Sequence, residues 1–305
     1  MTTSIDKASE VKDQRLADVL ANITDLPTIP QALINILNVI DDPASGPSDL
    51  ARAVRQDAPL MAKILRLANS PFYRPRGDIA DINRCVTVLG YRTVQQVAIS
   101  VSVASVLVKN PQGTNEAGHD ELDCRELWHH SVVTGAIAKQ LAKIAGLENP
   151  EELFTAGLLH DMGKFIMELH APGHYARLIP ESLAGPASLT ELELEKFGFE
   201  HAQLAAAFAQ SWRFPDVLVR PLAAHHDSPA PDPKQPFGQE AAIVALADYL
   251  ANTIEPPKVN LGFDPTRVNL PALYLACDIT EAQVCSDMSA IRESVQLAAP
   301  YLQID

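Results

Sequence analysis

The sequence predicts an all-α protein made of two helical lobes. Apolar residues recur at intervals of three and four along most of the chain, which is the period of one face of an α-helix. We find no run of alternating apolar and polar residues that would indicate a strand, and a polar, turn-rich stretch at 109–122 separates two groups of helical segments. The expected organisation is an N-terminal extension over 1–19, a first lobe over 20–110, a linker over 111–122 and a second lobe over 123–305.

The composition is that of a soluble globular protein, and it argues against two classes of partner. Apolar residues make up 47% of the 305 residues and charged residues 20%, which suffices for a large hydrophobic core. The formal net charge is −14, and the 24 Lys and Arg residues are scattered without a basic run. Because so acidic a surface repels phosphate backbones and anionic lipids, we expect no binding to nucleic acid or to membranes.

The cysteines and the first residues indicate a cytoplasmic protein. The four cysteines lie far apart and form no C-x-x-C pair, so we expect free thiols in a reducing compartment. The first residues lack the apolar core of a signal peptide, and no stretch of about 18 apolar residues is present to cross a bilayer.

In the first lobe, four short segments combine an apolar stripe with helix start or stop signals. Ser48 is the expected N-cap of the second segment, Asp57 caps the third, and Gly90 ends the fourth. A fifth segment, 94–108, is rich in valine and would also suit a strand, but its length and its helical neighbours favour a helix. The expected segments are 33–40, 47–56, 57–71, 82–90 and 94–108.

Six further helical segments are expected in the second lobe. Gly146 is the expected C-cap of the first, Pro150 lies at the start of the second, and Thr280 with Gln283 forms a capping box at the start of the last. Pro221 removes one helical hydrogen bond and should kink or restart its helix. The segments are 128–146, 150–170, 201–212, 215–226, 240–252 and 278–299.

The second lobe concentrates histidines and aspartates on apolar helix faces. Taken singly, each has an ordinary explanation as a hydrogen-bonded core residue. Together they would leave two buried carboxylates with no buried arginine evident on these helices to neutralise them, and an unpaired buried charge is strongly destabilising. The residues are His130, His160, Asp161, His201, His225, His226 and Asp248.

A divalent cation would neutralise this cluster. Imidazole nitrogens and carboxylate oxygens suit Fe, Mn, Zn, Co or Ni, and so many ligands could hold one ion or several. Glu126 precedes His130 by one helical turn and would add another oxygen. Residues 191–196, ELELEK, are expected to form a solvated helix face, from which Glu195 could reach toward His201.

The motif LLHDMGK, at residues 158–164, resembles the HD superfamily of metal-dependent phosphohydrolases, whose ligands follow the order H…HD…D. With LWHHS upstream and ALADYL downstream, the resemblance implies His130, His160, Asp161 and Asp248 as core metal ligands. The stretches HAQLAAAFAQSWRFP and AAHHD are similar to the HD-GYP branch, in which Lys164 would contact a substrate phosphate. This second resemblance adds the metal ligands His201, His225, His226 and Glu126.

The first lobe is similar to the HDOD domain in three stretches, LPTIPQALINIL, DAPLMAKILRLANSPFY and INRCVTVLGYRTVQQVAI. The resemblance extends from about residue 20 to about residue 300 and implies the two-lobed HDOD architecture with an HD-like second lobe. HDOD proteins generally have no established catalytic activity and act as regulators in bacterial signalling. After His225 and His226 this chain has DSPAPDPKQPFG in place of the G-Y-P signature, yet it keeps the ligand set that many HDOD relatives lose.

Two functions follow from these resemblances, and both stay open at this point. The favoured one is a regulatory HDOD module of bacterial signal transduction that retains a divalent-metal site, with a signalling protein or a nucleotide-like small ligand as its partner. The alternative is a metal-dependent phosphohydrolase acting on a nucleotide or another phosphoester, in which Asp161 and Lys164 would be catalytic. The sequence leaves the oligomeric state open.

Overall fold

The computed structural model describes residues 29–73, 75–107, 122–227 and 230–303. Within these ranges the chain is helical and contains no β-strand, so the predicted all-α class is confirmed. The expected N-terminal extension, 1–19, and nearly all of the expected linker lie outside the described residues. The four cysteines, all in the described part of the chain, form no disulfide bond. None of the described helices has both the length and the apolar character that crossing a membrane requires.

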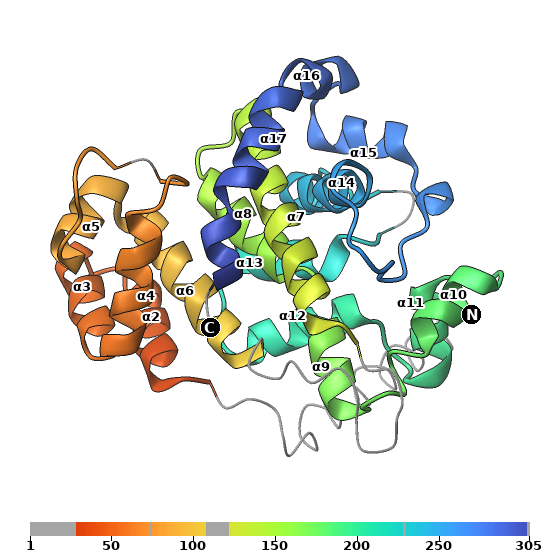
Figure 1. Ribbon diagram of the computed structural model, residues 1–305, viewed down its shortest axis with the longest axis horizontal. Helices are drawn as coiled ribbons and strands as arrows, with labels where there is room; N and C mark the ends of the chain where they lie inside the picture. Colours follow the sequence, from red (N-terminus) through yellow and green to blue (C-terminus); the bar gives the residue numbers. More distant parts are fainter. Residues whose placement is uncertain (1–28, 74, 108–121, 228–229, 304–305) are drawn as a thin grey trace.

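The described helices form two groups (Figure 1). The first group contains α2 (Gln31–Asp41), α3 (Pro47–Arg55), α4 (Ala58–Ala68), α5 (Ile82–Leu89) and α6 (Tyr91–Leu107). The second group contains α7 (Cys124–Ile144), α8 (Pro150–Leu159), α9 (Met162–His170), α10 (Leu178–Ala184), α11 (Leu189–Lys196), α12 (His201–Ser211), α13 (Asp216–Ala224), α14 (Gly238–Ile254), η1 (Pro265–Arg267), α15 (Leu270–Cys277), α16 (Glu281–Ser286), α17 (Met288–Leu297) and η2 (Ala299–Gln303).

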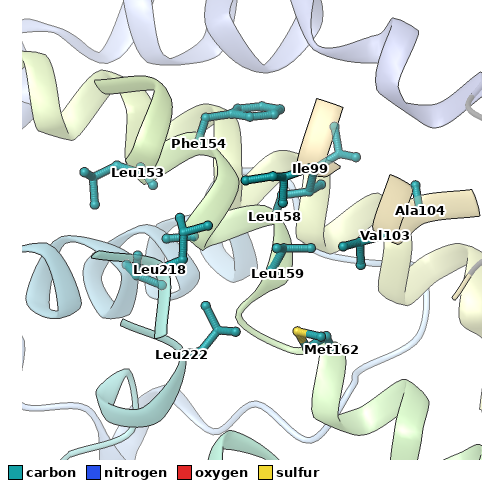
Figure 2. Packing of buried hydrophobic residues seen from close by; sticks show 14 of the residues in the cluster. Ile99, Val103, Ala104, Leu153, Phe154, Leu158, Leu159, Met162, Leu218 and Leu222 are labelled. Carbon is teal, nitrogen blue, oxygen red and sulfur yellow. The ribbon is translucent and has the colours of Figure 1, made fainter. Parts of the chain in front are cut away.

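Helix α6 lies between the two groups, which accounts for its valine-rich sequence. It packs against α2, α4 and α5 of the first group and against α8 and α9 of the second. Figure 2 shows Ile99 and Val103 of α6 in one packing cluster with Leu158 and Leu159 of α8. Because most residues of α6 are buried, the helix has no polar face, and its apolar period is therefore weak.

A single hydrophobic core extends through both groups. Phe72, from the LRLANSPFY stretch, packs on Phe154 and Tyr301, with ring centroids 5.1 and 5.7 Å away. The hydroxyl groups of Tyr73 and Tyr301 form a hydrogen bond of 2.6 Å. The ammonium group of Lys139 in α7 lies 4.0 Å from the centre of the Phe72 ring. This stretch therefore joins the first group of helices to the second.

The LLHDMGK motif contains a break between two helices, whereas the sequence predicts one helix over 150–170. Helix α8 ends just before the His–Asp pair, and α9 begins just after it. Helix α9 packs on α12, and Gly163 lies so close to the backbone of His201 that a Cβ would clash with the His201 carbonyl group. Tertiary packing thus overrides the helical period, and both His160 and Asp161 are buried in the turn.

One predicted N-cap is wrong, and one of the two alternatives predicted for Pro221, a restart of the helix, is excluded. Helix α3 begins at Pro47, with Gly46 rather than Ser48 as its N-cap, because the side chain of Asp49 accepts a hydrogen bond of 2.9 Å from the Gly46 amide. Helix α13 runs through Pro221 without restarting. Pro221 is itself buried among apolar residues of α13, and this packing offsets the single missing backbone hydrogen bond.

Most of the predicted helix ends are confirmed. Asp57 accepts a hydrogen bond from the amide of Leu60, Gly146 follows α7 with φ of +73°, and Thr280 forms the capping box of α16. The last predicted segment is divided at Asp287 into α16 and α17. Helices α10 and α15 were not expected from the sequence.

Candidate metal centre

Histidines and aspartates from separate helices meet at one place in the second group. They are His130 of α7, His160 and Asp161 between α8 and α9, His201 of α12, His225 and His226 after α13, and Asp248 of α14. Two glycines allow α7 and α8 to cross closely, since a Cβ on Gly157 would lie 2.9 Å from the Cα of Gly135. This crossing brings the rings of His130 and His160 to a centroid distance of 5.3 Å.

The first ligand group consists of His130, His160 and Asp248. Each residue offers one ligand atom, and these atoms lie within 4.8 Å of one another. The Nε2 atoms of His130 and His160 lie 2.9 and 3.7 Å from Oδ1 of Asp248. All three residues are buried.

The second ligand group consists of Asp161, His201, His225 and His226. Their ligand atoms also lie within 4.8 Å of one another. The Nε2 atoms of His201 and His225 lie 3.2 and 3.9 Å from Oδ1 of Asp161. The Nε2 atom of His226 lies 3.1 Å from that of His201. His226 is the exposed member, whereas the other three residues are buried.

Asp161 faces both ligand groups with different oxygens. Its Oδ1 atom faces His201 and His225, as described above. Its Oδ2 atom lies 3.3 Å from Nε2 of His160 and 4.0 Å from Nε2 of His130. One carboxylate therefore lies between two sets of imidazoles and would offer one oxygen to each ligand group if cations were bound.

Several buried ligand atoms have no hydrogen bond of good geometry. They are Nε2 of His160, Nε2 of His225 and both carboxylate oxygens of Asp161. The other ring nitrogens are engaged, since Nδ1 of His160 donates to the carbonyl of Gly157 at 2.7 Å and Nδ1 of His225 donates to that of Leu222 at 2.9 Å. A proton held on Nδ1 leaves the Nε2 lone pair of a neutral imidazole directed at the cluster. These residues fit a metal centre.

The charges of the cluster shift the pKa values of its histidines in opposite directions. Burial alone would lower the pKa of His160, but the adjacent aspartates raise it to about 10. Burial also opposes a charge on His201, but Glu193 and the neighbouring aspartate raise its pKa to about 9. For His225, burial and the surrounding histidines hold the pKa well below its ordinary value.

Lys164 supplies a positive charge that the sequence-based expectation of unneutralised carboxylates left out. Its Nζ atom is buried and lies 2.8 Å from Oδ2 of Asp161, an ion pair whose angle falls outside hydrogen-bond geometry. Burial alone would lower the pKa of Lys164, but the charge of Asp161 raises it. The protein therefore neutralises much of this negative charge itself. The unpaired Nε2 atoms indicate a cation more directly than the buried carboxylates do.

The structure does not bring Glu126 into either ligand group. One carboxylate oxygen of Glu126 accepts a hydrogen bond of 2.9 Å from the amide of Lys258. The other oxygen pairs with the ammonium group of the same lysine, also at 2.9 Å. Lys258 therefore holds the carboxylate that the resemblance implies as a further ligand.

A buried glutamate beside the cluster was missed. Glu193, rather than Glu195, contacts His201, with Nδ1 of His201 donating to the Glu193 carboxylate at 2.8 Å. Glu195 is exposed and pairs with Lys196. Apolar spacing could have revealed this, because Leu189 lies one helical turn before Glu193 and both are buried. The predicted solvated face of 191–196 is therefore wrong at Glu193.

A cavity of about 610 Å³ opens onto the cluster, and residues of both ligand groups line it. Tyr249 and Phe263 form part of its wall, with their rings edge to face at 5.9 Å. Arg267 lies at the same wall and pairs with Glu191 at 3.3 Å. The volume lies within the range of small-molecule binding sites.

Comparison with known proteins gives a family match and similar structures. A family model for the HDOD domain matches residues 26–228. An uncharacterized protein of Treponema pallidum (strain Nichols) is 28% identical over 234 residues, which cover 75% of this chain and 43% of that protein. The chain thus spans less than half the length of this relative.

Two solved structures have the same fold. A candidate phosphohydrolase of Shewanella amazonensis SB2B is 23% identical, with a TM-score of 0.70 and coverage of 93% of this chain and 97% of that one. A candidate signal transduction protein of Marinobacter aquaeolei VT8 is 20% identical, with a TM-score of 0.74 and coverage of 97% and 66%. At these identities the similarity shows the fold alone.

Proposed function

Because this chain belongs to the HDOD domain family, we propose that it is a regulatory module of bacterial signal transduction whose second group of helices holds two divalent cations. The family match and the fold similarity to a candidate signal transduction protein support the regulatory role. The partner in this proposal is a signalling protein or a nucleotide-like small ligand.

One observation carries the metal part of the proposal. The two oxygens of the buried Asp161 carboxylate face separate ligand groups, and His160 and His225 direct unpaired Nε2 atoms at the same place. A set of imidazoles and carboxylates is suited to Fe, Mn, Co, Ni or Zn rather than to Ca or Mg.

The protein's own residues would hold and orient these ligands. The carbonyl groups of Gly157 and Leu222 keep protons on Nδ1 of His160 and His225, so that Nε2 stays available when each ring is neutral. Lys164 neutralises part of the Asp161 charge and limits the negative charge at the centre.

Elemental analysis tests the metal proposal. The purified protein is reconstituted with Mn²⁺, Fe²⁺, Co²⁺, Ni²⁺ or Zn²⁺, freed of excess metal and analysed beside Asp161→Asn. We expect about two ions per wild-type chain and the loss of at least one in the variant, because Asn retains the shape but not the charge of the shared ligand. Asp227→Asn is the matched control, since Asp227 lines the same cavity outside both ligand groups. A wild-type content below about 0.1 ion per chain with every metal would refute the proposal.

The cavity favours a second candidate function, a metal-dependent phosphohydrolase. Its volume of about 610 Å³ would admit a small phosphoester beside the ligand groups, and Lys164 lies in its wall. A bound cation would supply an activated water by lowering the water pKa to about 7. The Lys164 ammonium group, which is buried beside the cluster, would hold a phosphate oxygen.

Hydrolysis assays separate this second function from a purely regulatory one. The metal-loaded protein is tested on a generic phosphodiester and on cyclic dinucleotides, beside Asp161→Asn and Lys164→Met. Activity lost in both variants would support the enzyme. Activity that survives in Asp161→Asn would indicate a contaminant, and no activity in a fully loaded wild-type protein would leave the regulatory function.

A further inference from the structure

We infer that Glu193 is a positioning residue that aims His201 at the metal centre and thereby sets the affinity of the second ligand group. The inference rests on the proposed metal site. It adds a role for a residue that lies outside both ligand groups, in a stretch for which the sequence predicted a solvated helix face.

Glu193 has 0% of its surface exposed, and both of its carboxylate oxygens accept hydrogen bonds. Nδ1 of His201 lies 2.8 Å from each of its carboxylate oxygens, and the backbone amide of His201 donates to Oε2 at 2.9 Å. The hydroxyl of Tyr175 donates to Oε1 at 2.8 Å. Burial alone would raise the pKa of Glu193, but the charge and hydrogen bonds of His201 lower it.

These contacts fix the direction of the opposite ring nitrogen. With Nδ1 held by Glu193, Nε2 of His201 lies 3.2 Å from Oδ1 of Asp161 and 3.1 Å from Nε2 of His226. By contrast, Nδ1 of His160 and of His225 donates to a neutral carbonyl group. A carboxylate partner makes an imidazole a stronger ligand than a carbonyl partner does, so His201 differs chemically from the other two.

A further set of hydrogen bonds holds Glu193 in place. Glu168 of α9 accepts hydrogen bonds from the amides of Gly173 at 2.8 Å and Ala176 at 3.1 Å. These bonds fix the turn that carries the fully buried Tyr175, whose hydroxyl donates to Glu193. Helix α9 thus carries both the end of the LLHDMGK motif and the support for a ligand from α12.

A purely structural role for Glu193 would leave some of these contacts unexplained. A cap for the start of α12 needs one acceptor for the amide of His201, and Glu200 with Gln203 already forms a capping box there. The bond to Nδ1 and the full burial of the charge contribute nothing to such a cap. They do control the position and the electron density of the His201 ring.

The test is a calorimetric titration of the full chain with Mn²⁺ and with Co²⁺, comparing wild type, Glu193→Gln and Glu195→Gln. Gln retains the size of Glu193 and one acceptor oxygen but removes the charge. We expect Glu193→Gln to weaken one of the two binding steps by about 10- to 100-fold and to leave the other within about threefold. The visible spectrum of bound Co²⁺ should change with that step. Glu195→Gln, an exposed change on the same helix, should alter neither step.

The outcomes are distinct. The inference would be overturned if Glu193→Gln bound both cations with wild-type affinity, or if it weakened both binding steps equally. If the wild type takes up no cation, the proposed function fails. The ring ¹⁵N chemical shifts of His201 then decide the positioning role, and identical shifts in wild type and Glu193→Gln would overturn it. If Glu193→Gln does not fold, Tyr175→Phe and Glu193→Asp replace it in the titration. Wild-type affinities for both binding steps in both of these variants would then count against the inference.

Discussion

At the scale of single residues, the buried carboxylate of Asp161 has one ammonium and two imidazole nitrogens within 3.3 Å of its oxygens. Lys164 lies 2.8 Å away, His201 3.2 Å and His160 3.3 Å. Burial alone would raise the pKa of Asp161, but the charges of His160 and Lys164 hold it well below its ordinary value. The raised pKa values of His160 and His201 mean that protons compete with a cation for their Nε2 atoms.

Cation uptake is therefore expected to depend on pH. The pKa values of His160 and His201, about 10 and about 9, lie above the value of about 6.5 for an unfolded chain. Their protonated forms stabilise the metal-free fold fully below about pH 6.5, and this contribution is lost as the pH rises through 9 to 10. The affinity for a cation changes with pH in the opposite direction. It should rise by about tenfold per pH unit for each proton that the cation displaces.

Calorimetric titrations at pH 6.5, 7.5 and 8.5 measure this dependence. Repeating each titration in two buffers of different ionisation enthalpy counts the protons released. Asp227→Asn, which leaves both ligand groups intact, is the control and should release as many protons as the wild type. An affinity that stays constant over this range would contradict the assignment of His160 and His201 as protonated ligands.

At the scale of helices, small residues determine how closely the ligand-bearing elements approach. Gly135 and Gly157 lie where α7 crosses α8, and Gly163 lies where α9 begins against α12. In each place a side chain would meet backbone atoms, which cannot rotate out of the way. The glycine of the HDMGK motif is thus explained by helix packing and needs no direct contact with a ligand.

Gly163→Ala is expected to lower the free energy of unfolding by about 1–3 kcal/mol and to weaken cation binding, because α9 and α12 must separate. Gly46→Ala is the matched control, since a Cβ at residue 46 would meet nothing within 4 Å. Because alanine is a poorer N-cap than glycine, the control should lower stability by up to about 1 kcal/mol, which is less than Gly163→Ala. Urea denaturation followed by circular dichroism gives both values, and equal stability of the two variants would contradict the packing role of Gly163.

At the scale of the whole molecule, the LRLANSPFY stretch connects the two groups of helices. Phe72 packs on Phe154 of α8, and the Tyr73–Tyr301 hydrogen bond joins positions 228 residues apart in the chain. Together with the packing of α6 on α8, these contacts make the first group part of the same core as the metal centre. In the regulatory role proposed above, these contacts would connect the first group physically to the second.

A double-mutant cycle on Tyr73 and Tyr301 tests the connection. Tyr73→Phe leaves the buried hydroxyl of Tyr301 without this partner and should lower the free energy of unfolding by about 1–3 kcal/mol. Tyr301→Phe should cost less, because Tyr73 is only partly buried. The double variant should lie closer to wild type than the sum of the single effects, since neither hydroxyl then remains unpaired. Strict additivity would mean that the two hydroxyls do not interact.

The sequence predicts the helix caps well, but it predicts poorly where a helix breaks and where it continues. The caps at Asp57 and Thr280 depend on residues within one helical turn, and both are confirmed. The turn at the HD motif and the uninterrupted α13 depend on which helices pack against these segments. A periodic pattern carries no information about such neighbours, so one continuous helix was expected in the first case and a kink or restart in the second.

The sequence by itself determined the helical class, the apolar faces and the residues able to bind a metal, because periodicity and side-chain chemistry are local properties. Only the tertiary structure decided which of these side chains share a centre. It places the two oxygens of Asp161 before different ligand groups, pairs Glu126 with Lys258 and turns Glu193 toward His201. These arrangements depend on how closely helices distant in sequence cross, and that distance is set by packing across the whole core.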